Sequence, residues 1–166
     1  MGKRIFMISL FIVGLVACST QESTVEKINR AEKLTKAAEY DEALKIYQTV
    51  KATEELPDTL DAMVSFSLAD IYLNHKNQYR KAIEYYREVA EEYSDTQWGA
   101  KSQFLLGYVN ANHLRNYDIA EEEYQVFLDL YPTHELTTAV EFELNHLGAD
   151  PTELDSLDFL QSAAQQ

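Results

Sequence analysis

The stretch QYRKAIEYYREVAEEYSD (78–95) decides the fold, because a related stretch, NYDIAEEEYQVFLDLYPT (116–133), follows it after 38 residues. This shift places identical residues on one another: Tyr79 and Tyr117, Ala82 and Ala120, Tyr86 and Tyr124, and Tyr93 and Tyr131. A fixed period of this length indicates a tandem array of similar units, each packed on its neighbours.

The residues upstream of each stretch repeat as well. One period separates the members of two further sets, which are Phe66, Phe104 and Phe142, and Leu68, Leu106 and Leu144. A more diverged copy lies 39 residues before the first stretch and carries Tyr40, Ala43 and Tyr47. The sequence therefore predicts an array over residues 24–148, with units at 24–57, 59–95 and 97–133 and a half-unit at 135–148.

Each unit reads as two helices. Apolar residues recur three and four positions apart, as in Ala82, Tyr86, Val89 and Tyr93, which is typical of a helix with one buried face. Capping boxes are predicted where an acidic residue follows a capping residue by three positions, at Ser23 with Glu26, Asp58 with Asp61, and Asp150 with Glu153. We expect an all-α fold with helices near 24–38, 41–54, 59–75, 79–93, 97–114, 117–131, 135–147 and 151–163.

The order of small and aromatic residues resembles the tetratricopeptide repeat. Leu106-Gly107, Ala120, Tyr124 and Pro132 match that pattern in order, although the period is 38 residues here and 34 in the family. The resemblance implies an α-solenoid of antiparallel helix pairs wound into a right-handed superhelix. Its long-period form is similar to repeats of periplasmic and outer-membrane proteins. Residues 149–166 would then be a helix that caps the open end, or a segment that detaches to bind a partner.

The resemblance also implies a groove lined by the first helix of each unit. Its candidate partner-binding residues are Phe66, Asp70, Asn74, Lys101, Phe104, Tyr108, Asn112, Phe142 and His146. Two interpretations stay open for the three phenylalanines, because aromatic residues at these positions also serve core packing. Asp70, Tyr108 and His146 are favoured for partner contact, since packing is not expected to demand polar groups there.

The N-terminus has the order of an export signal. Lys3 and Arg4 precede the uncharged run 5–16, which is shorter than the roughly 20 residues that span a bilayer. Leu15 to Cys18 (LVAC) resembles the lipobox of bacterial lipoproteins, which implies cleavage between Ala17 and Cys18, diacylglycerol and fatty acyl chains on Cys18, and outer-membrane sorting. Residues 1–17 would be the signal peptide and 18–23 a short tether. The alternative is a buried or idle thiol.

The net charge and the motifs of the sequence argue against several classes of function. Residues 1–17 carry two positive charges and no acid, so their removal would change the net charge from −14 to −16, which argues against nucleic-acid binding. Metal binding by His75 and His113, one period apart, is disfavoured against a role at helix ends. The acidic runs are read as a solvated face, and no recognisable catalytic motif occurs.

These observations predict a non-enzymatic scaffold of the bacterial cell envelope. We expect no cofactor, metal or small-molecule substrate, a lipid anchor to the membrane, and a partner segment from an envelope protein. Resemblance to lipoproteins such as that of the β-barrel insertion machine favours outer-membrane protein assembly. The alternative is an adaptor that regulates peptidoglycan synthesis or cell division.

Overall fold

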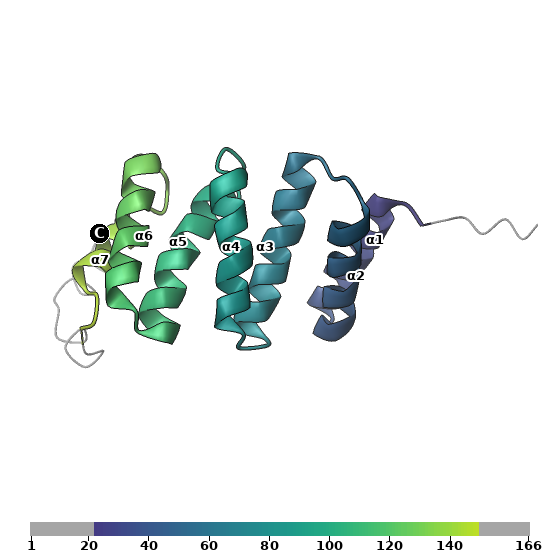
Figure 1. The fold of residues 1–166 in the computed structure, drawn as a ribbon, viewed down its shortest axis with the longest axis horizontal. Helices are drawn as coiled ribbons and strands as arrows, with labels where there is room; N and C mark the ends of the chain where they lie inside the picture. Colours follow the sequence, from purple (N-terminus) through teal and green to yellow (C-terminus); the bar gives the residue numbers. More distant parts are fainter. Residues whose placement is uncertain (1–21, 150–166) are drawn as a thin grey trace, which may run out of the picture.

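The helices follow one another as an elongated row, in sequence order, in the computed structural model, which describes residues 22–149 (Figure 1). They are α1 (Thr24–Lys36), α2 (Tyr40–Thr53), α3 (Asp58–Asn74), α4 (Tyr79–Glu92), α5 (Gly99–Val109), α6 (Tyr117–Leu130) and α7 (Thr137–Asn145), with a π-helical turn at Asn110–Leu114. Residues 22–149 contain no strand, and extensive contacts join consecutive helices. The prediction of an all-α solenoid is confirmed. The predicted helix 151–163, the signal segment and Cys18 lie outside the described residues.

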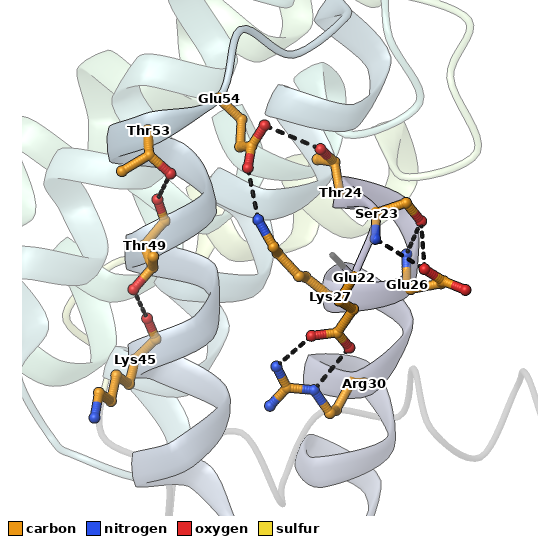
Figure 2. Close-up of polar contacts among 10 residues, drawn as sticks. All are labelled: Glu22, Ser23, Thr24, Glu26, Lys27, Arg30, Lys45, Thr49, Thr53 and Glu54. Carbon is orange, nitrogen blue, oxygen red and sulfur yellow. Dashed lines mark hydrogen bonds and ion pairs between the residues drawn. The ribbon is translucent and has the colours of Figure 1, made fainter. Parts of the chain in front are cut away.

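Two of the predicted capping boxes can be compared with the structure. The Ser23 hydroxyl accepts a hydrogen bond from the Glu26 N–H at 3.3 Å, and the Glu26 carboxylate accepts one from the Ser23 N–H at 2.8 Å, which confirms the first box (Figure 2). The second, at Asp58, is wrong, because Pro57 precedes the first helical residue and no side chain caps α3. Asp61 is engaged elsewhere and accepts hydrogen bonds from Lys51 and from the Tyr93 hydroxyl, both at 2.8 Å.

The core is built from tyrosines that pack against small residues. Tyr47, Tyr86 and Tyr124, one on each second helix, are at most 1% exposed. Close approach of the helices requires small partners, and a Cβ atom added to Gly107 would lie only 2.4 Å from Cε1 of the buried Tyr124 ring. The small positions expected from the repeat pattern are buried, as Ala69, Ala82, Gly107 and Ala120.

Ionic contacts join the second helices across the row. The Lys51 ammonium contacts Glu88 on α4 and lies 2.8 Å from Asp61 on α3. Arg87 on α4 contacts Glu123 on α6 at 2.5 Å. Glu123 is 8% exposed and also accepts a hydrogen bond from the Gln103 side chain at 2.9 Å, so its buried charge is compensated from two helices.

The first helix of the third unit differs from the predicted helix 97–114. Regular α-helix covers Gly99–Val109, and the last turn is π-helical. The buried Asn110 amide donates to the carbonyl oxygen of Leu106 at 2.8 Å. A side chain that bonds the carbonyl four residues back competes with the main-chain ladder, which accounts for the changed helical turn.

The turns inside the units share a left-handed residue. Ala38, Asn77 and Arg115 have φ angles of 63°, 52° and 56° and follow one another at the spacing of the array. Residues with a Cβ atom are strained in this region, by roughly 1–2 kcal/mol, and asparagine tolerates it best. The turn geometry thus repeats although the residue type does not.

Ala38→Gly should therefore stabilise the protein by about 1 kcal/mol, because glycine adopts this φ angle without strain. The measurement is the free energy of unfolding from urea denaturation. The control is Ala37→Gly, at a φ angle of −84°, which should destabilise by roughly 0.5–1 kcal/mol through added chain entropy. Equal effects of both substitutions would contradict a special role for the left-handed position.

Candidate partner-binding surface

The first helices α1, α3, α5 and α7, with the turns at their ends, form one side of the row, here called the inner surface. All nine candidate residues belong to it: Phe66, Asp70 and Asn74 on α3, Lys101, Phe104 and Tyr108 on α5, Asn112 in the π-helical turn, Phe142 on α7 and His146 at its end. Asn74, Lys101 and Asn112 are exposed, and the other six are partly exposed. Every candidate side chain is thus accessible from solvent.

The phenylalanines of the inner surface also take part in packing. The Phe66 ring lies edge-on to Tyr86, with 5.5 Å between the ring centroids, and Phe104 lies 6.1 Å from both Tyr124 and Tyr108. Phe66 and Phe104 pack against the core from the outside while keeping part of their surface exposed. Core packing and partner contact are therefore compatible at these two positions.

Asp70 corrects one expectation. Packing was expected to demand no polar group there, but the Asp70 carboxylate accepts a hydrogen bond of 2.6 Å from the hydroxyl of the fully buried Tyr86. Burial raises the pKa of Asp70 above its usual 3.8, against the lowering effect of the Tyr86 hydrogen bond. Burial, followed by the charge of Asp70, likewise raises the pKa of Tyr86.

The neighbouring units explain why a hydrogen-bond acceptor is needed at this position. Burial raises the pKa of Tyr47, and hydrogen bonding with Ser67 on the next first helix lowers it. The hydroxyl of Tyr124 points to Glu143, also on the next first helix, at 3.5 Å. Leu105 lies one period after Ser67 and one period before Glu143, and its apolar side chain offers Tyr86 no acceptor. Asp70, from the same unit as Tyr86, supplies it instead.

Two hollows open on the inner surface. The first has a volume of about 200 Å³, lies between α1 and α3, and is lined by residues that include Glu32, Thr35, Asp70 and Asn74. The second, of about 270 Å³, lies between the π-helical turn and α7 and brings together three candidates, Asn112, Phe142 and His146. Lys101, Phe104 and Tyr108 line neither hollow. The candidate surface thus has a recess near each end, and the one beside α7 is mainly polar.

The second hollow contains a residue that the sequence did not single out. Arg115 lines it from the left-handed turn position, and no ion pair of Arg115 occurs within residues 22–149. His146 holds its ring by a 2.7 Å contact between Nδ1 and the carbonyl oxygen of Phe142. Arg115 occupies the same left-handed turn position as Ala38 and Asn77, but the three residue types differ. The residue types therefore do not reveal the shared φ angle, and nothing in the sequence marked Arg115.

A larger hollow of about 450 Å³ lies at the N-terminal end of the row, between α1 and α2, and includes no candidate residue. Lys27, Arg30 and Lys45 line it. Lys27 is bonded to Glu54 at 2.7 Å and Arg30 to Glu22 at 2.8 Å, so two of its three cations have acidic partners (Figure 2). The Lys27–Glu54 pair joins α1 to the end of α2, and the Arg30–Glu22 pair joins α1 to the residue before its own N-cap.

The two histidines of the repeat lie at helix ends, as the sequence indicated. His75 follows α3 and stacks on Tyr40, with ring centroids 3.6 Å apart, and His113 stacks on Tyr79 at 4.5 Å. Each stack joins the first helix of one unit to the second helix of the unit before it. Within the described part of the chain, no group of three or more His, Cys, Asp or Glu residues could hold a metal ion.

The paired helices, their period and their common inner side define a tetratricopeptide-repeat protein. Residues 9–104, more than half of the chain, match the SusR N-terminal TPR domain, and residues 101–134 match the tetratricopeptide repeat. The chain belongs to the family of the SusR N-terminal TPR domain. No curated protein matches it. Domains of this type bind protein partners.

The burial of Asp70 makes a pH-dependent prediction. A carboxyl group whose pKa is raised on folding favours the folded state only while it is protonated, and this contribution is lost as the pH rises through the folded-state pKa. Asp70→Asn keeps an acceptor for Tyr86 without the charge. We expect its melting temperature to exceed that of the wild type at pH 7, and the difference to shrink as the pH falls towards 4. The exposed Asp118→Asn is the control; an equal gain there would contradict the argument.

Proposed function

We propose that this protein is a non-enzymatic scaffold of the bacterial cell envelope that binds a segment of a partner protein on its inner surface. The observation that carries the proposal is the inner surface itself. It offers partly exposed aromatic rings at Phe66, Phe104 and Phe142, one period apart, with a hollow near each end. Apolar surface with a few placed polar groups is the usual composition of a recognition site.

The spacing of these groups favours a helical or extended segment over a small molecule. Equivalent residues of successive units lie roughly a helix-packing distance apart, so an occupant must span several units to contact all of them. An amphipathic helix would lay its apolar face on the rings, and its polar side chains would reach Asp70 or Arg115. The scaffold would need no cofactor for this role.

The envelope location rests on the N-terminal sequence. Lipid on Cys18 would anchor the chain, because two or more acyl chains hold a protein stably at a membrane. About five residues separate Cys18 from α1, a reach of about 17 Å, so the array would stand close to the membrane and its embedded proteins. No helix within residues 22–149 is long and apolar enough to cross a bilayer. We infer a role in outer-membrane protein assembly.

Tyr108→Ala should weaken partner capture several-fold and leave thermal stability nearly unchanged. Tyr108 is partly exposed at the middle of the inner surface, and its ring rests beside Phe104 rather than within the core. Affinity purification from the native envelope measures capture, and circular dichroism measures stability. A large loss of stability would instead assign Tyr108 to the core.

A photo-crosslinking residue at position 108 identifies the partner, with the exposed Glu84 on α4 as the matched control position. Crosslinks at 108 to a component of the outer-membrane barrel machinery would support the proposal. Crosslinks to a peptidoglycan synthase or hydrolase would replace assembly by wall metabolism. The same partners at both positions would contradict an inner-surface site.

Cys18→Ala should abolish labelling of the protein by a fatty-acid analogue and leave the precursor uncleaved, because the thiol is the proposed site of lipid attachment. Metabolic labelling followed by gel analysis measures both effects. Ser19→Ala is the control and should label normally. Labelling that persists without the thiol would rule out the anchor.

A further inference from the structure

The outer side of α6 carries an apolar stripe that the solenoid does not need. Ile119, Val126 and Leu130 are 43%, 41% and 57% exposed. Their spacings of seven and four residues place them on one face of the helix, over about 16 Å at 1.5 Å per residue. They are three of the five large hydrophobic side chains that are exposed within residues 22–149.

The other units carry different residues at these three places. One period earlier, on α4, the three places are taken by Lys81, Glu88 and Glu92, and on α2 they are taken by Glu42, Thr49 and Thr53. All six are polar. On α4, Glu88 also contacts Lys51 of α2 and accepts a hydrogen bond from Ser65, and the Lys81 ammonium lies 5.0 Å from the centroid of the Tyr72 ring, whereas Glu92 is exposed. None of the six equivalent residues is apolar, so the apolar stripe is particular to α6.

The surroundings of the stripe are acidic. Asp118, Glu122 and Asp129 are exposed on its free side, and the Arg87–Glu123 pair borders it towards α4. Residues 150–166 carry four acids and no lysine or arginine, so their charge opposes binding here. Antiparallel symmetric pairing of two copies through this face would set the two acidic rows against each other.

We propose that the α6 stripe binds an amphipathic helix of another protein that carries basic residues along the edges of its apolar face. The apolar stripe supplies buried area, and the acidic border selects for lysine and arginine and against acidic or self-derived partners. This site lies on α6, the second helix of its unit, and thus on a different side from the inner surface. It does not depend on the function proposed above.

Binding can be measured by fluorescence anisotropy with a labelled synthetic helix of leucine and lysine in an amphipathic pattern. The full chain is used in phosphatidylcholine nanodiscs, with empty nanodiscs as the blank. The key variant, Ile119→Lys with Val126→Glu and Leu130→Glu, installs the residues of α4 and should fold with an unchanged melting temperature. We expect its affinity to fall at least tenfold. Because the variant gains one net negative charge, weaker electrostatic attraction cannot account for that loss.

Two further measurements separate the α6 stripe from the inner surface and from attraction by net charge alone. A leucine–glutamate helix of the same pattern should bind at least tenfold more weakly than the lysine helix, and a fall in affinity in Tyr108→Ala would place the peptide on the inner surface and overturn the proposal. Unchanged affinity in the α6 variant would overturn the proposal. So would equal binding of the two peptides. Sedimentation that shows a dimer lost in the α6 variant would also overturn it, in favour of a second copy as the occupant.

Discussion

Each unit of this protein buries one tyrosine whose hydroxyl must find a hydrogen-bond partner, and much of the structure follows from that requirement. The ring of Tyr124 occupies the space that Gly107 leaves free. Because a buried hydroxyl without a partner costs roughly 1–3 kcal/mol, a polar residue must also stand on a neighbouring first helix. Asp70 and Glu143 meet this demand for Tyr86 and Tyr124. Small residues and polar residues on the first helices are thus two consequences of one buried side chain.

This requirement links the core to the inner surface. Asp70 and Glu143 each line a hollow while they serve a tyrosine of the core. A partner that bonds Asp70 therefore meets a carboxylate that is already oriented by Tyr86, which reduces the entropy lost when the contact forms. Substitutions on this surface are then expected to change stability and binding together where the residue serves a tyrosine, and binding alone at Tyr108.

The period and the residue types were sufficient to predict the helices, their pairing and the tyrosine core. These features were predictable because small and aromatic residues recur at fixed positions of each unit, and the packing of helices depends on the size of the residues between them. The hydrogen bond of Asp70 to Tyr86 could not be predicted, because the repeat pattern does not show which residue accepts from each tyrosine: Glu143 serves Tyr124, but the equivalent residue for Tyr86 is the apolar Leu105. The left-handed φ angles of Ala38 and Arg115 were missed for a related reason: the turn is imposed by the packing of the helices it joins, so the residue type follows no rule. Asp58 was misread as a cap because α3 already begins at Asp58, after Pro57, and the carboxylate of Asp61 is held by Lys51 and Tyr93.

Because the units repeat, the residues at equivalent positions of different units can be compared with one another. In a solenoid each unit meets nearly the same neighbours, so equivalent positions experience the same packing demands. Where the residues at such positions agree, as at Ala82 and Ala120, packing alone accounts for them. Where one unit departs at a place that is exposed in both, as at Leu130 and the equivalent Glu92, packing within the array does not account for the difference. A difference between units therefore points to a partner more directly than any single exposed residue does.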